Sequence, residues 1–335
     1  MATTNLRAGL IGLGMMGRHH ARNLRSVDGV DLVAVADSFG DPHGVADDLE
    51  VLPDVEALIA AGIDYAVVAV PTQFHLDVAL ALAEANVHCM IEKPLAFDIG
   101  EAEEIAGAFE KAGLVGAVGY IERYNPALQE MRKRIADGQL GEIYQITTRR
   151  QGAFPARIRD VGVVKDLATH DLDLTAWVAD SEYATVGATS TRRSGRDDED
   201  MVSIAGRLAD DTITNHLVNW LSPLKERITV VTGENGALIG DTINADLTFH
   251  ANAETSNNEW ESIASFRGVS EGDSIRYSLQ RKEPLRTEHE ALRDAINGDV
   301  SNIVTMREGL HTVRVVEAVL ESARDQSMVE IAPSR

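Results

Sequence analysis

Lys93, Asp166 and His170 are residues whose types suit proton transfer to or from an alcohol. Oxidation of an alcohol by hydride transfer releases a proton, so a site for that reaction needs a base that titrates near neutral pH, and histidine is the natural candidate. The ammonium of Lys93 can hydrogen-bond the reacting oxygen, and partial desolvation can tune its pKa for that task. Asp166 could orient His170 or bind a substrate hydroxyl itself.

A predicted helix over residues 163–179 carries two of these candidates. Asp166, His170 and Asp173 are spaced i, i+4 and i+7, so we expect their side chains to share one face. The same spacing fits a buried polar stripe between a helix and a sheet, and Lys93 equally fits a surface lysine at a strand end. From the residues alone both interpretations remain open. A metal site is disfavoured, because the cluster lacks a second histidine or a cysteine.

A glycine-rich turn near the N-terminus indicates a dinucleotide. An apolar run ends in Gly12, Gly14 and Gly17, in the pattern G-x-G-x-x-G, and leads straight into a predicted helix that begins Arg18-His19-His20. Met15 and Met16, within the turn, are counted with the glycines as cofactor-binding residues. The first glycine permits a tight turn, the second lets the backbone approach a pyrophosphate, and the third lets the helix pack close to the strand. The free N–H groups at the start of such a helix face the phosphates.

The next predicted strand, Val30–Ala36, ends in Asp37, at the position expected for an acid that binds the ribose. Its carboxylate can hydrogen-bond the ribose 2′-hydroxyl and would repel a 2′-phosphate. Ser38, the next residue, offers no positive charge to offset that repulsion. We therefore expect NAD rather than NADP as the cofactor.

Strands and helices alternate over residues 6–120, which is typical of a parallel sheet with helices on both faces. Ligands of such sheets lie beyond the carboxyl ends of the strands, where the strand order reverses. Residues at the ends of the later predicted strands are therefore counted with the glycine turn and Asp37 as cofactor-binding: Pro71, Thr72, His75, Glu92 and Lys93.

The pattern changes after Tyr120, where strands follow one another with few helices between them. The candidate strands span 185–192, 201–207, 212–220 and 228–232, which predicts a mostly antiparallel sheet. We expect loops over 251–275 around a strand near Ile263, and two closing helices. The predicted fold is α/β plus α+β: a Rossmann domain over 1–122 and an open-faced sheet domain over 123–335 for substrate binding and oligomerisation.

Whole-chain properties narrow the class of protein. The length of 335 residues suits two domains, and the net charge of −22 argues against nucleic acid or an anionic membrane as partner. No window resembles a membrane span, and the single Cys89 excludes an intrachain disulfide. Because the first predicted strand begins within a few residues of Met1, we expect no signal peptide. We expect a cytoplasmic protein. Because helices would cover only one face of the second sheet, we also expect a homodimer or homotetramer.

The glycine turn, Asp37, Glu92-Lys93-Pro94 and Asp166-x3-His170 together resemble the Gfo/Idh/MocA family of oxidoreductases, as does the segment from Pro71 to His75. The resemblance covers nearly the whole chain. It implies that Lys93, Asp166 and His170 act on the substrate alcohol. It also implies a Rossmann domain followed by an open-faced sheet domain that supports dimers or tetramers.

Within that family, the segments 157–167 and 219–225 look like the nucleotide-sugar branch, in which UDP-N-acetylglucosamine or its uronic acid is oxidised at the 3-hydroxyl. Polyol branches usually carry a Gly-rich run where this chain has Val163-Val164-Lys165. Arg157 and Arg159 would suit a diphosphate or carboxylate, although solvated surface charge explains them equally well.

Tyr120, Arg123 and Asn125 lie at the predicted domain boundary and are candidates to line the substrate cleft. Two alternatives to a nucleotide-sugar dehydrogenase remain. One is an inositol or free-sugar dehydrogenase of the same family, and the other is a non-catalytic NAD-binding regulator. The presence of both Lys93 and His170 argues against a regulator.

Overall fold

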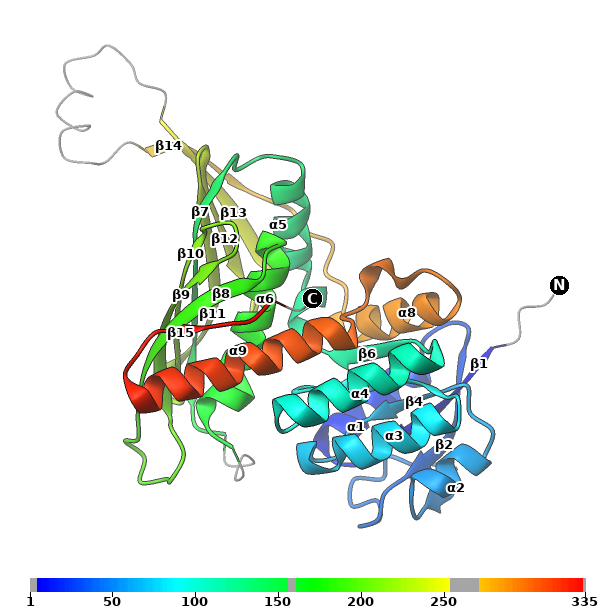
Figure 1. Cartoon of the computed structure of the whole chain (residues 1–335). Helices are drawn as coiled ribbons and strands as arrows, with labels where there is room; N and C mark the ends of the chain where they lie inside the picture. The colour runs from blue at the N-terminus through cyan, green and yellow to red at the C-terminus, as the bar shows by residue number, and fades with distance from the viewer. Residues whose placement is uncertain (1–4, 156–160, 254–270, 334–335) are drawn as a thin grey trace, which may run out of the picture. The chain divides into compact units, whose positions relative to one another are not determined.

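The chain forms two compact units in the computed structural model, which describes residues 5–155, 161–253 and 271–333 (Figure 1). Among these residues, unit 1 comprises residues up to 124 together with 282–317, and unit 2 comprises 125–281 and 318–333. Residues 282–317, which the sequence analysis placed in the second domain, therefore pack with the first. An amphipathic helix pattern shows which face of a helix is buried but not which sheet it covers.

Unit 1 contains a six-stranded parallel sheet in the order β3-β2-β1-β4-β5-β6. The order reverses between β1 and β4, which is the switch point where such sheets bind ligands. Its elements are β1 (Leu6–Ile11), α1 (Met15–Leu24), β2 (Val30–Ala36), β3 (Val51–Leu52), α2 (Val55–Ala60), β4 (Tyr65–Val68), η1 (Thr72–Phe74), α3 (His75–Glu84), β5 (His88–Glu92), α4 (Ile99–Ala112), β6 (Gly116–Gly119), η2 (Ile121–Tyr124), α8 (Pro284–Ile296) and η4 (Val300–Asn302).

Side chains of the central strands of unit 1 alternate between two hydrophobic cores. In β4, Ala66 and Val68 pack in the core that includes α2, α3 and α4, whereas Tyr65 and Val67 pack in the core that includes α1 and α8. This alternation has the period of two that strand geometry dictates. Burial on both faces explains why these strands read as continuous apolar runs.

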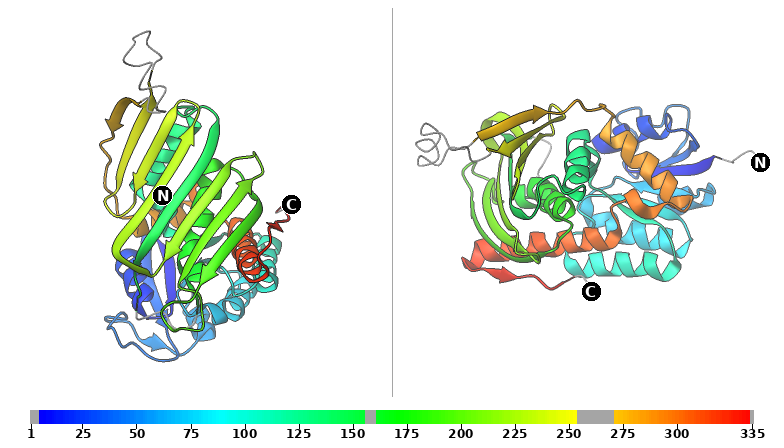
Figure 2. Two further views of the ribbon diagram at one scale, coloured as in Figure 1. Left: turned by 90° about the vertical axis from the view of Figure 1, so that its left-hand side faces the viewer. Right: turned by 90° about the horizontal axis from the view of Figure 1, so that it is seen from above.

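Unit 2 contains a nine-stranded sheet in the order β14-β13-β12-β11-β7-β10-β9-β8-β15 (Figure 2). Among the described strands of this sheet, only β7 and β10 pair in parallel, so the predicted fold class is confirmed. Its elements are α5 (Pro126–Ala136), β7 (Ile143–Ala153), a π-helix η3 (Val164–Ala168), α6 (Thr169–Ala179), β8 (Tyr183–Thr191), β9 (Met201–Leu208), β10 (Ile213–Asn219), β11 (Leu221–Gly233), β12 (Gly236–Asp241), β13 (Asp246–Asn252), β14 (Glu271–Arg276) and β15 (Val329–Glu330). Helix α9 (Met306–Asp325) begins in unit 1 and ends in unit 2.

One face of the nine-stranded sheet is covered by α5 and α6, whose apolar side chains share a core with β7, β11, β12 and β13. Along β9 the burial alternates strictly, with Val202, Ile204 and Leu208 facing that side. The expected strand near Ile263 lies outside the described residues. No helix in the described part of the chain is both long and apolar enough to cross a membrane.

A buried ion pair attaches α6 to the sheet. Arg150 Nε on β7 donates to Asp171 Oδ2 on α6 at 2.8 Å, and both side chains are buried. Tyr183 and Thr148 hold His216 on the same side, each through a 2.8 Å contact with a ring nitrogen. Because buried polar groups are costly without partners, these contacts fix the helix in one position on the sheet.

We expect the substitution Asp171→Ala to lower the free energy of unfolding by about 3 kcal/mol, because it removes the carboxylate that a buried arginine pairs with. Chemical denaturation followed by circular dichroism measures this change. Asp325→Ala is the control, since its pair with Arg324 is exposed and should leave stability unchanged within error. Equal effects of the two substitutions would contradict the structural role of the buried pair.

Candidate active site

The glycine turn brings the start of α1 against the end of β1. Gly12 has φ +95°, and a side chain there would press on the backbone of Ala69. A side chain at Gly17 would overlap the carbonyl oxygen of Gly12, whereas Gly14 faces open space. Helix α1 begins at Met15, so its first N–H groups have no partner within the helix. This arrangement fits a pyrophosphate held by backbone N–H groups.

Asp37 lies directly after β2 and is held by backbone N–H groups. Its Oδ2 accepts from Leu13 N at 2.7 Å and its Oδ1 from Phe39 N at 2.8 Å. Each carboxylate oxygen can accept a further hydrogen bond. Asp37 is therefore an oriented carboxylate beside the glycine turn, which is the geometry that recognises a ribose hydroxyl.

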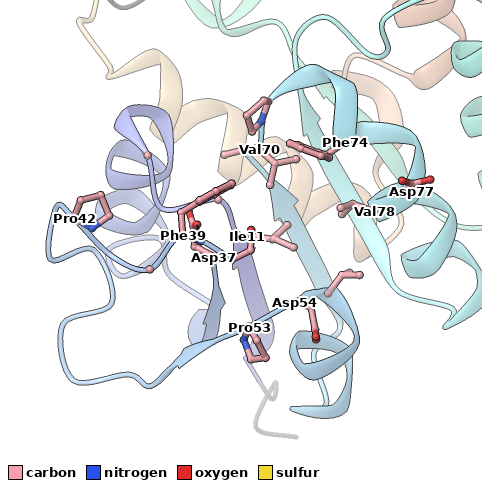
Figure 3. A pocket seen from close by; sticks show the side chains of 17 residues that line it. Ile11, Asp37, Phe39, Pro42, Pro53, Asp54, Val70, Phe74, Asp77 and Val78 are labelled. Atoms are coloured by element: carbon pink, nitrogen blue, oxygen red, sulfur yellow. Dashed lines mark hydrogen bonds between the residues drawn. The ribbon is translucent and has the colours of Figure 1, made fainter.

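A pocket of about 520 Å³ opens at this edge of the sheet (Figure 3). Its lining includes Gly12 and Gly14 of the glycine turn, Asp37 after β2, and Pro71 in the loop after β4. Phe39 and Phe74 lie on opposite sides of it in this view. A mostly apolar lining, with the oriented carboxylate of Asp37 beside the glycine turn, suits a flat ring joined to a sugar.

Glu92 and Lys93 lie at the carboxyl end of β5. Glu92 is 9% exposed, and its Oε1 accepts from His20 Nε2 at 2.8 Å while its Oε2 accepts from Lys93 N at 3.2 Å. Burial alone would raise the pKa of Glu92, but the hydrogen bond from His20 and the charge of Lys93 outweigh it and lower the pKa. Glu92 is therefore a carboxylate at neutral pH, and half-buried Lys93 follows it on the cofactor edge.

His75, which the sequence placed among the cofactor residues, joins two loops. Its ring nitrogens lie 3.1 Å from the carbonyl oxygens of Val70 and Pro94, and the side chain is 1% exposed. Burial lowers the pKa of His75, so the ring is neutral near pH 7 and donates its single N–H to one of these carbonyl oxygens. These contacts fix the end of β4 relative to the end of β5.

Asp166 and His170 lie on consecutive helices of unit 2. Asp166 falls in the π-helix η3 and is buried, whereas His170 is half-buried in the first turn of α6. The α-helical spacing assumed from the sequence therefore applies only from Thr169 onward, and His170 and Asp173 share it. Short π-helical turns often occur at functional sites, because they rotate one side chain out of the regular helical register.

Glu199 holds the start of η3, a role that the sequence did not predict. Val164 N donates to Glu199 Oε1 at 3.0 Å and Val163 N donates to its carbonyl oxygen at 2.9 Å. A side chain at Gly162 would overlap the Glu199 carboxylate. In the sequence this glutamate falls in the acidic run Asp197-Asp198-Glu199-Asp200, and only its burial distinguishes it.

Asp200, the next residue, accepts hydrogen bonds from the backbone of the turn between β8 and β9. Its Oδ2 accepts from Arg193 N at 2.7 Å and from Ser194 N at 2.6 Å. Burial would raise the pKa of Asp200, but these backbone hydrogen bonds outweigh it and lower the pKa. Trp220 N in turn donates to the carbonyl oxygen of Asp200 at 2.9 Å.

Three other sequence candidates are buried and contact protein groups. Tyr120 is fully buried, and Arg123 pairs with Glu308 within unit 1. Asn125 caps α5 by accepting from Ala127 N at 3.0 Å. Asn125 therefore has a structural role. Arg157 and Arg159 lie outside the described residues. Within the described ranges, no group of three or more acidic, histidine or cysteine side chains is arranged to hold a metal ion.

Two family models match the chain. The oxidoreductase family, NAD-binding Rossmann fold, matches residues 6–120, and the oxidoreductase family, C-terminal alpha/beta domain, matches residues 132–331. This chain belongs to the Gfo/Idh/MocA family. Unit 1 of this oxidoreductase family member thus includes an NAD-binding Rossmann domain, which confirms the cofactor expected from Asp37.

Individual relatives in the family differ in substrate. The chain is 33% identical to a UDP-N-acetylglucosamine 3-dehydrogenase from Acidithiobacillus ferrooxidans. The match covers 63% of this chain and 66% of the relative, so it spans just under two thirds of the relative's length. It is 32% identical to an inositol 2-dehydrogenase from Acidothermus cellulolyticus over 71% of its own length and 74% of the relative's. A solved structure of UDP-N-acetylglucosamine 3-dehydrogenase GnnA from Acidithiobacillus ferrooxidans superposes with a TM-score of 0.83 at 25% identity, over 96% of this chain and 98% of that one.

We expect Asp37→Ala to lower the ratio of the dissociation constants of NADP+ and NAD+ about tenfold, which corresponds to about 1.4 kcal/mol. The substitution removes both the partner of the ribose hydroxyl and the charge that repels a 2′-phosphate. Dissociation constants from calorimetry provide the measurement. Asp77→Ala is the matched control, because this carboxylate lines the same pocket from α3. Tighter binding of NADP+ than of NAD+ by the unsubstituted protein would contradict the assignment.

Proposed function

We propose that this protein is an NAD-dependent dehydrogenase that oxidises a secondary hydroxyl, at C3, of a nucleotide sugar such as UDP-N-acetylglucosamine. The observation that carries the proposal is the set of reactive groups on its two units. Lys93 follows β5 at the cofactor edge of unit 1, and Asp166 and His170 lie on the helices of unit 2. The similarity to the Acidithiobacillus ferrooxidans enzyme supports the nucleotide sugar as substrate class.

Each residue has a role that its chemistry suits. Bound NAD+ supplies the hydride acceptor. His170 accepts the hydroxyl proton at a ring nitrogen, and Lys93 holds and polarises the same oxygen while it becomes a carbonyl. Asp166 orients the histidine or binds a neighbouring hydroxyl. Arg157 and Arg159 are proposed to bind the diphosphate, for which guanidinium groups offer paired donors.

We expect Lys93→Ala and His170→Ala each to lower kcat by about 100-fold or more, because general acid–base groups typically contribute that much. Dinucleotide affinity should stay within about threefold, since the glycine turn and Asp37 hold most of the cofactor. Steady-state kinetics and calorimetry give the two quantities. His250→Ala is the control, because this histidine on β13 is exposed and its side chain hydrogen-bonds only Ser274 among the described residues. Unchanged turnover in either variant would remove that residue from the mechanism.

A substrate panel distinguishes the candidate functions. The panel contains UDP-N-acetylglucosamine, its uronic acid, free N-acetylglucosamine and myo-inositol, each followed by nicotinamide absorbance. We expect turnover only with the nucleotide sugars. Turnover of inositol would favour the second candidate, an inositol dehydrogenase, which the similarity to the Acidothermus cellulolyticus enzyme supports. Cofactor binding without turnover of any sugar would favour a regulator.

We also propose that the uncovered face of the nine-stranded sheet joins copies of this chain. Ile213 and Leu217 on β10 point away from the covered face and are 46% and 38% exposed. We expect a dimer or tetramer in light scattering, and Leu217→Arg should shift it toward smaller species because a buried charge opposes association. Val300→Arg, at an exposed apolar residue of unit 1, should have no such effect. A monodisperse unsubstituted monomer would contradict this proposal.

A further inference from the structure

A buried chain of hydrogen bonds leads from the interior of unit 1 to Glu92. His289 Nε2 on α8 lies 3.0 Å from His20 Nδ1 on α1, and His20 Nε2 lies 2.8 Å from Glu92 Oε1 on β5. Both histidines are fully buried. Three elements that are far apart in sequence thus meet through these side chains, and neither histidine carries a role in the proposed reaction.

The direction of the hydrogen bonds follows from the carboxylate. An ionised carboxylate only accepts, so His20 Nε2 must carry a hydrogen. Burial lowers the pKa of His289, which keeps that ring neutral with a single N–H. Its Nδ1 has no hydrogen-bond partner in the described part of the chain. The hydrogen of His289 therefore lies on Nε2, which donates it to His20 Nδ1.

Among the buried groups Glu92, Glu288, His20 and His289, Glu92 carries the negative charge, and the half-buried ammonium of Lys93 follows it in the chain. Glu288 is 1% exposed, and burial together with the nearby Glu92 charge raises its pKa well above the usual value. Glu288 therefore stays protonated and adds no second negative charge. Across the sheet, a side chain at Gly119 would come within 3.3 Å of the Glu92 backbone and carboxyl carbon. Glu92 is thus enclosed on the β6 side and held from the α1 side.

The order of the strands places Glu92 on the nicotinamide side of the dinucleotide. Asp37 at the end of β2 marks the adenosine ribose, and the glycine turn at the end of β1 marks the pyrophosphate. In the order β2-β1-β4-β5, the other half of the dinucleotide extends toward β4 and β5. Glu92 ends β5 and immediately precedes Lys93.

We propose that His20 and His289 are positioning residues that hold Glu92 as an oriented carboxylate at the nicotinamide side, and that this fixed negative charge favours NAD+ over NADH. The oxidised nicotinamide ring is a cation and the reduced ring is neutral, so a carboxylate nearby stabilises the oxidised form selectively. Without the donor on His20, the buried carboxylate takes up a proton or turns away, and the selectivity is lost.

The test is the ratio of the dissociation constants of NADH and NAD+ for the full chain, measured without any sugar by NADH fluorescence and by competition with NAD+. We expect His20→Phe to weaken NAD+ binding about tenfold relative to NADH. His20→Gln keeps a side-chain N–H at the position of Nε2 and should restore the ratio to within about threefold. His289→Phe should shift the ratio in the same direction by less, because His20 can then change tautomer. His19→Phe, the neighbouring histidine on α1, is the matched control.

Glu92→Gln gives the deciding result if His20→Phe does not fold, because this substitution preserves shape and removes only the charge. The proposal is wrong if Glu92→Gln leaves the ratio unchanged, or if His20→Phe and His20→Gln change it equally. An unchanged ratio in His289→Phe removes that residue from the proposal. The measurement needs no substrate, so its failure is distinguishable from failure of the proposed dehydrogenase function.

Discussion

The contact between Gly17 and the carbonyl oxygen of Gly12 determines the geometry of the cofactor side. Because no side chain fits there, α1 packs directly on the end of β1, and its first N–H groups face the crevice at the switch point. His20 lies one turn after Gly17 on the same helix face. The close approach that serves the pyrophosphate therefore also carries His20 into the core, where it reaches Glu92.

A second close approach, in unit 2, orients the other half of the proposed chemistry. Gly162 leaves room for the Glu199 carboxylate. That carboxylate accepts a hydrogen bond from the backbone N–H of Val164 and so fixes the first turn of η3, the π-helix that contains Asp166. Farther along, the pair of Arg150 and Asp171 holds α6 to the sheet. Each unit thus positions its reactive side chains through buried polar contacts behind them.

The sequence was informative where function depends on local pattern. The glycine spacing, Asp37 after a strand and Lys93 before a proline are all readable, because strand ends and turns impose residue types over short distances. The return of α8 to unit 1, the partners of His20 and the burial of Glu199 were not readable, since they depend on which distant segments pack together. The π-helical turn at Asp166 was also missed, because its hydrogen bonding departs from the period that sequence patterns report.

The most direct test of the proposed dehydrogenase uses UDP-N-acetylglucosamine that carries deuterium at C3. After incubation with the protein and NAD+, mass spectrometry of the recovered cofactor shows whether the deuterium has moved. Transfer from C3 predicts deuterated NADH together with a 3-keto sugar that has lost the label. Unlabelled NADH would show that hydride leaves another position. Absence of reduced cofactor, with NAD+ bound and both units folded, would contradict the assignment of nucleotide sugars as substrates.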